Sequence, residues 1–208
     1  MGYSKEIANK IEDNKNKYID AGIQENITLD NVEIKESPTG MKLFQINFVN
    51  DEGQVFPHTE WEPRMGGFID TEDKLNRAMN RQYKRMLQIL LCFYKDEEID
   101  FNGEKFSDFA KYIAEKLNNA SKEIKLRVKI VFNKNGFITL PNSASEKFIE
   151  PMSIPKEESA IKIGPKDIIV RPIVADKETS DANPFKTDDT VNTIDTPKSS
   201  TENGDLPF

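Results

Sequence analysis

The sequence predicts a mainly β fold with helices inserted between its third and fourth strands. Three observations support this prediction. Residues 26–62 alternate apolar and polar side chains, residues 70–117 repeat apolar side chains at helical spacing, and residues 123–139 return to alternation. A period of two indicates strands with one buried face, and a period near 3.6 indicates amphipathic helices. The chain is therefore expected to form strands, then helices, then strands again.

The first three strands are predicted at 26–37, 41–50 and 54–62. Within the first strand, the parity of the apolar side chains changes at Asp30-Asn31. Such a change predicts a β-bulge, which bends a strand around a curved sheet. The turn sequences SPTG and NDEG separate the three strands. Pro57 has no N–H for a ladder, so we expect the third strand to be bulged or to lie partly at an edge.

Two helices are predicted next. Asp70 or Thr71 can cap the first helix, and Glu72 and Asp73 then occupy its first turn. Acidic residues are favourable there because the amino end of a helix carries partial positive charge. The second helix is predicted from a compact apolar stripe formed by Phe106, Phe109, Ala110, Ile113 and Leu117.

The last third of the body returns to strand patterns. Residues 123–132 alternate strictly, and the turn NKNG leads into FITLP, which predicts a hairpin. Ser143 and Glu146 have the spacing of a capping box, so a short helix is predicted within 143–150. The apolar run at 167–174 is expected to return to the sheet edge as an extra strand.

Five short antiparallel strands with a helix between the third and fourth have the arrangement of the OB barrel. We therefore predict a five-stranded OB-fold antiparallel barrel over residues 23–174. A helical arm at 1–22 precedes it, and a disordered acidic tail at 175–208 follows. An α+β sandwich remains an alternative, because a sequence pattern indicates element types better than their topology.

Composition excludes several classes of function. No apolar run reaches the 18 residues that a membrane span needs, and we expect no contact with a membrane. The single cysteine, Cys92, excludes an internal disulfide and looks structural, while the single histidine, His58, leaves no Cys/His zinc site. His58 is interpreted as an ordinary strand residue. Glu60 and Glu62 point the same way but lack the partner groups of an active site. We expect a cytoplasmic protein that is not an enzyme and needs no cofactor.

The charge is distributed unevenly. The whole chain carries a net charge of −7. Residues 175–208 contain eight acids and three lysines, a net charge of −5, which leaves 26 bases and 28 acids, or −2, for residues 1–174. The tail also has few large apolar residues, and such a composition predicts disorder. The body is therefore close to neutral, and the overall charge does not exclude binding to nucleic acid.

The tail finishes on GDLPF, which SDANPF at 180–185 partly repeats. An acidic tail with an acid, an aliphatic residue, proline and phenylalanine at its tip resembles the single-stranded DNA-binding proteins of bacteria and bacteriophages. The bacterial family typically ends in an Asp-Asp-Ile-Pro-Phe-like sequence, and the strand pattern here is more similar to phage-encoded members. The long helices between the third and fourth strands depart from the bacterial pattern, so the oligomeric state is not predicted.

The resemblance implies a function and partners. It implies a protein that coats exposed strands during DNA replication, recombination and repair, in the cytoplasm of a bacterial host cell. It also implies that the tip docks on replication and recombination proteins through Asp205, Leu206, Pro207 and Phe208. Two alternatives are a recombination mediator or annealing protein with the same fold, and a structural or interaction protein whose tail only aids solubility.

A protein that binds single strands needs cations along the phosphate backbone. The candidates on the predicted strand 123–132 and just beyond it are Lys125, Arg127, Lys129 and Lys134. The alternative is a solvated exterior face, which lysines also favour. A second set on the first helix comprises Arg77, Arg81 and Arg85 with Lys74 and Lys84, and Arg64 precedes that helix. For the helix we favour a solvated face, because the helix of an OB barrel usually lies away from the binding strands.

Such a protein also needs aromatic rings on which bases stack, and the third strand offers two. Phe56 and Trp61 lie on opposite parities of this strand, so at most one faces the core if the strand is regular. A lone tryptophan is more often a core anchor than a stacking platform. We therefore rank Phe56 slightly above Trp61 as the residue that stacks on a base.

Overall fold

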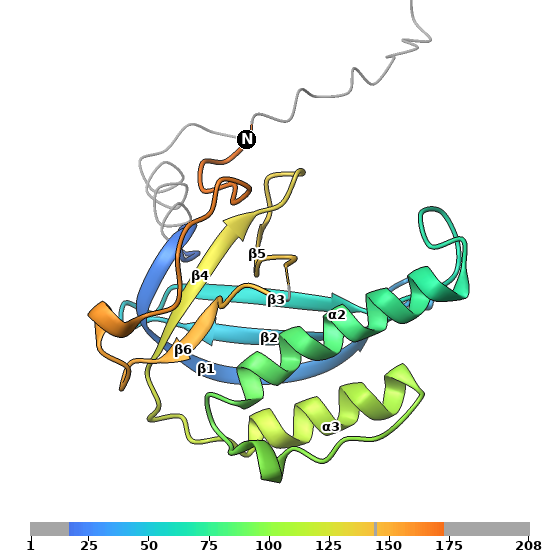
Figure 1. Cartoon of the computed structure of the whole chain (residues 1–208), viewed down its shortest axis with the longest axis horizontal. Coiled ribbons are helices and arrows are strands. Elements are labelled where there is room, and N and C mark those ends of the chain that lie inside the picture. The colour runs from blue at the N-terminus through green and yellow to red at the C-terminus, as the bar shows by residue number, and fades with distance from the viewer. Residues whose placement is uncertain (1–16, 144, 173–208) are drawn as a thin grey trace, which may run out of the picture. The chain divides into compact units, whose positions relative to one another are not determined.

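Over the residues that it describes, this computed structural model has a mixed α/β fold with an antiparallel sheet and two helices (Figure 1). Both helices lie between the third and fourth strands, as predicted. The strands are β1 (Gly22–Glu36), β2 (Lys42–Val49), β3 (Val55–Trp61), β4 (Leu126–Phe132), β5 (Ile138–Thr139) and β6 (Ile149–Pro151). The helices are α2 (Glu72–Leu90) and α3 (Phe106–Asn118), with short 3-10 turns at Asp96–Glu98 and Lys156–Glu158.

The structure describes residues 17–143 and 145–172. The predicted tail at 175–208, including its docking tip, lies outside the described residues. The same holds for residues 1–16 of the predicted amino-terminal arm.

The strands follow the order β3-β2-β1-β4-β5, and β6 pairs with the amino-terminal half of β4. No backbone ladder joins β3 to β5 within the described part of the chain, so the sheet is not closed into a barrel. The prediction of a closed barrel is therefore wrong. β3 pairs with β2 in unbroken register, with Asn47 opposite Pro57. Pro57 thus lies on an edge strand, as expected, and no bulge is present there.

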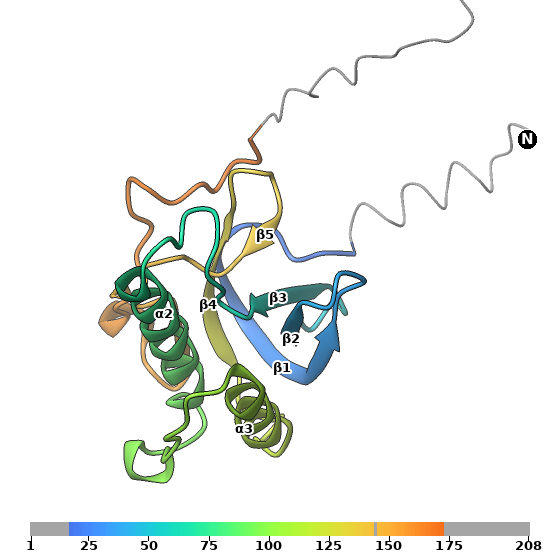
Figure 2. The same ribbon diagram turned by 90° about the vertical axis from the view of Figure 1, so that its right-hand side faces the viewer.

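The long strand β1 connects the two halves of the sheet. Its carboxyl-terminal half pairs with β2, and its amino-terminal half pairs with β4. The register shifts between Leu29 and Asn31, which confirms the predicted bulge. A second irregularity lies between Gln24 and Ile27, where Asn26 has a φ of 57°. These two sites bend β1 and produce the strong curvature visible in Figures 1 and 2.

Helix α3 packs against β1 and β2, and α2 contacts β3 and β6. The Thr71 side chain accepts a hydrogen bond of 3.3 Å from the Lys74 backbone N–H, so Thr71 is the N-cap of α2. All five residues of the predicted apolar stripe on α3 are buried. Phe44 of β2 stacks on Phe106, with the ring centroids 5.8 Å apart, and meets Phe109 edge-on. The core of the fold therefore lies between the two helices and the sheet, and it contains buried residues of β1, β2, β3, β4 and β6.

Two predicted elements differ in the structure. The short helix expected at 143–150 does not form over the described residues, and part of this segment becomes β6. Phe148 and Ile149 are buried there, which extended backbone beside β4 permits. The strand expected at 167–174 does not form through residue 172, where the description stops. That segment contacts β4 through the Phe132 N–H, which donates to the Ile168 carbonyl at 2.7 Å.

Candidate nucleic-acid interface

A cleft of about 920 Å³ opens beside β3. Residues 58–61 of β3 form its floor, and α2 forms one wall with Ala78, Arg81 and Arg85. The opposite wall consists of the β4–β5 hairpin and residues 166–168. The loop after β3 and the β4–β5 hairpin rise on the same side of the molecule, as Figure 2 shows. The cleft is therefore built from segments that are far apart in the sequence.

Exposed cations line this cleft from four separate segments. They are Arg64 after β3, Arg81 on α2, Lys134 in the β4–β5 turn and Lys166. Arg64 also pairs with Glu62 at 2.5 Å and donates to the Gly40 carbonyl at 3.2 Å. Three of these cations were candidates from the sequence, whereas Lys166 was missed. Because one helix and three loop segments supply them, no single periodic pattern predicts that they lie together.

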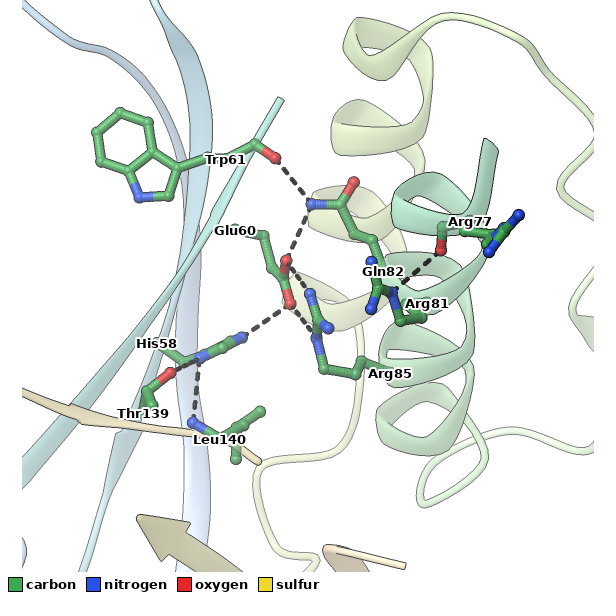
Figure 3. A network of polar contacts seen from close by, with 9 residues as sticks. All are labelled: His58, Glu60, Trp61, Arg77, Arg81, Gln82, Arg85, Thr139 and Leu140. Atoms are coloured by element: carbon green, nitrogen blue, oxygen red, sulfur yellow. Dashed lines mark hydrogen bonds and ion pairs between the residues drawn. The ribbon is translucent and has the colours of Figure 1, made fainter. Parts of the chain in front are cut away.

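Trp61 lines the same cleft and is 45% exposed. Phe56 is fully buried and stacks on Phe48, with the ring centroids 5.7 Å apart. The two residues lie on opposite faces of β3, as the parity predicts, but their ranking was wrong. A ring without an exposed face cannot stack on a base, so Phe56 belongs to the core. Trp61 is therefore the exposed aromatic residue of β3, and its indole points away from α2 while its carbonyl faces that helix (Figure 3).

The cations predicted on the polar face of β4 are not exposed together. Arg127 is buried, and it donates to Glu150 at 2.5 Å and to Glu25 at 3.1 Å. Lys129 is fully buried, and its Nζ contacts Asp167 at 2.8 Å and Glu146 at 3.1 Å.

The prediction of an exposed row of cations on β4 is therefore wrong, because residues 146–167 cover the second face of this strand. Lys125 remains partly exposed and pairs with Asp51. It does not line the cleft.

The two other helix candidates have different environments. Arg85 has a side chain that is only 12% exposed, and it forms a bidentate ion pair with Glu60. Arg77 is exposed and lies one turn before Arg81, outside the residues that line the cleft (Figure 3). Of the helix cations predicted to bind DNA, Arg81 is the one that lines the cleft with an exposed side chain.

The floor of the cleft contains a buried polar network centred on Glu60 (Figure 3). His58, Gln82 and Arg85 all contact this carboxylate at distances between 2.7 and 3.0 Å. Burial alone would raise the pKa of Glu60, but the hydrogen bonds from His58 and Arg85 outweigh burial and lower it to about 2. Glu60 is therefore ionised at neutral pH. His58 is not an ordinary strand residue, as the sequence had suggested, but a member of this network.

Two further exposed aromatic residues escaped the sequence analysis. Phe68 is 97% exposed, at a tight turn in which Gly66 and Ile69 exchange two backbone hydrogen bonds. Gly66 and Gly67 both have positive φ values, which this turn requires. Phe137 is also exposed and follows Gly136 at the β4–β5 turn. In both cases a glycine-containing turn followed by phenylalanine was the available signal.

The exposed side chains that line the cleft include four cations, Trp61 and the carboxylate of Glu146, and the buried polar groups of the floor bind one another. Among the described residues, no buried side-chain polar atom lacks a hydrogen-bond partner. The described part of the chain also contains no group of three His, Cys, Asp or Glu side chains that could hold a metal ion. No helix in that part is long and apolar enough to cross a membrane.

Comparison of the chain with protein-family models, with curated proteins and with solved structures finds no match.

Proposed function

We propose that this protein binds single-stranded DNA in the cleft beside β3 and has no enzymatic activity. One observation carries the proposal: four exposed cations from separate segments line a cleft that is also lined by Trp61, whose side chain is half-exposed. Cations along a groove neutralise phosphates, and an aromatic ring stacks on bases of any sequence. A binder of exposed strands needs both features in one place.

The strand order supports an OB-type fold as part of this proposal. In an OB barrel the strands follow a ring in which the third and fifth strands are also neighbours. The order β3-β2-β1-β4-β5, with helices between β3 and β4, is that ring opened between β3 and β5. The cleft lies beside this opening, because residues of both strands line it.

The cellular role extends the proposal. We propose that the protein coats exposed strands during DNA replication, recombination and repair in the cytoplasm of a bacterial host cell, as phage-encoded members of the resembled family do. The tip Asp205–Phe208 then recruits partner enzymes. Phe208 supplies an aromatic ring and Asp205 a carboxylate, which an apolar pocket with a basic rim can hold together.

Binding of a labelled oligo-dT tests the DNA-binding role, with a duplex of equal length as competitor. We expect the single strand to bind more tightly and its affinity to fall with salt. Trp61→Ala should weaken binding by about 5- to 150-fold, because one stacked base is worth about 1–3 kcal/mol. Trp61→Phe keeps a ring and should retain most of the affinity. A protein that shows no salt-dependent binding to oligo-dT would instead be a structural or interaction protein.

A further inference from the structure

The carboxylate of Glu60 is unusual for a site that binds a polyanion. It lies on the floor of the cleft, only 3% exposed, between the cations that are proposed to hold phosphates. A fixed negative charge there opposes phosphate binding, and burying a carboxylate is costly unless its charge is paired and hydrogen-bonded. An apolar residue at this position would avoid both costs. The contacts that Glu60 makes indicate why a carboxylate is present there.

Glu60 joins β3 to helix α2. Arg85 donates to both carboxylate oxygens, with Nε 2.7 Å from Oε1 and Nη2 2.7 Å from Oε2. One turn earlier on the helix, the Gln82 amide donates to Oε2 at 2.9 Å and to the Trp61 carbonyl at 3.0 Å. The backbone of Trp61 is therefore fixed to the same helix that carries Arg81. These bonds fix the backbone of β3 at Trp61 relative to this wall of the cleft.

Glu60 also joins β3 to the opposite wall through His58. The His58 Nε2 lies 3.0 Å from Glu60 Oε1, and its Nδ1 lies 3.4 Å from the Leu140 backbone nitrogen and 3.4 Å from the Thr139 hydroxyl. A backbone N–H can only donate, so Nδ1 is the acceptor and Nε2 carries the proton that Glu60 accepts. Within the described residues no ladder joins β3 to β5. This relay of side chains connects the two strands where backbone pairing is missing.

We infer that Glu60 is the positioning residue of the cleft: it holds β3, α2 and the β4–β5 hairpin at a fixed separation and keeps the Arg85 charge from the DNA. The inference rests on the proposed function. It divides the helix cations into two roles, because Arg81 is exposed for phosphate whereas Arg85 serves the network. The cleft is then already shaped before a strand arrives, which lowers the ordering cost of binding.

The sign of one mutational effect tests this inference. Glu60→Gln removes a negative charge from the cleft with little change in shape. If charge alone mattered, oligo-dT would bind more tightly. If Glu60 positions the walls, oligo-dT should bind at least tenfold more weakly despite the gain in net positive charge. Glu62→Gln is the matched control, because Glu62 lines the same cleft at its edge and pairs with Arg64. We expect the control to bind equally well or a few-fold more tightly.

Wild-type binding to oligo-dT is measured first, and its absence would overturn the proposed function together with this inference. If the wild type binds, equal or tighter binding by Glu60→Gln overturns the positioning role alone. All affinities are measured well below the melting temperature of each variant, so that a loss of global stability does not imitate a loss of affinity.

Gln82→Met keeps every charge and removes only the amide that links Glu60 to the Trp61 carbonyl. It should weaken binding while leaving the slope of log affinity against log salt unchanged, and it should shift the Trp61 emission. If Glu60→Gln does not fold, this variant decides the outcome, since wild-type affinity and emission would contradict the inference.

Discussion

Replacement of three cations of the cleft should change the salt dependence of DNA binding in a calculable way. Arg81, Lys134 and Lys166 lie on three segments around the cleft, and their side chains are exposed. Each phosphate neutralised on a single strand contributes about −0.7 to the slope of log affinity against log salt. If each of the three cations neutralises one phosphate, changing all three to Gln should flatten that slope by about two.

The flattening has a consequence that is simple to measure. Between 50 and 200 mM salt, a slope difference of about two changes the loss of affinity by roughly twentyfold. Titrations of labelled oligo-dT at four salt concentrations therefore suffice. The matched control changes Lys95, Lys111 and Lys156 to Gln, because these lysines are exposed and do not line the cleft.

Both triple variants carry the same net charge, which falls from −7 to −10. A general effect of charge would therefore flatten both slopes equally, and this result would refute a localised DNA path. An unchanged slope in the cleft variant would place the DNA elsewhere on the surface. We expect a flattened slope in the cleft variant and a nearly unchanged slope in the control.

Three further predictions concern the core residue Phe56, the buried carboxylate of Glu60 and the tip Asp205–Phe208. Phe56→Ala should lower the free energy of unfolding by about 3–5 kcal/mol, because the ring is fully buried against Phe48. Denaturant titration measures this loss, and a loss below about 1 kcal/mol would argue against a core position. The pKa of Glu60 in the folded protein is about 2, against an ordinary 4.5. The contribution of ionised Glu60 to the free energy of unfolding is therefore present above pH 4.5 and is lost as the pH falls towards 2. The advantage of the wild type over Glu60→Gln in unfolding free energy should then shrink by on the order of 3 kcal/mol, and a constant difference between pH 5 and pH 2 would refute the pairing. Deletion of Asp205–Phe208 should leave the affinity for oligo-dT undiminished. In a pull-down from host cells, the deletion variant should capture no replication proteins. Recovery equal to that of the full chain would contradict the docking role.

Short sequence patterns correctly predicted the features that neighbouring residues determine. The bulge at Asp30-Asn31 followed from a parity change within one strand, and the Thr71 cap followed from the residues at the helix start. The buried stripe of α3 followed from its own spacing. Each of these features is decided by residues within a few positions of one another, so the sequence alone contains the signal.

Contacts between distant segments decided what the sequence analysis missed. The alternation in β4 is real, yet Arg127 and Lys129 are buried because Glu150 and Asp167, which come later in the chain, cover and neutralise that face. Likewise, parity separated Phe56 from Trp61 without telling which face points inward. Two polar partners of Glu60, Gln82 and Arg85, lie on a helix 22 and 25 residues away, and only the folded chain brings them to this carboxylate.

Trp61 is the only tryptophan in the chain and lies in the cleft, so its fluorescence tests DNA binding at this site most directly. Unlabelled oligo-dT is titrated into the wild-type protein at several salt concentrations, and binding is followed in parallel by the anisotropy of a labelled oligomer. Our proposal predicts a saturable quenching of Trp61 emission with the same midpoint as the anisotropy, and a shift of both midpoints to higher concentration as salt rises. Binding by anisotropy without any change in Trp61 emission, or no binding by either signal, would contradict it.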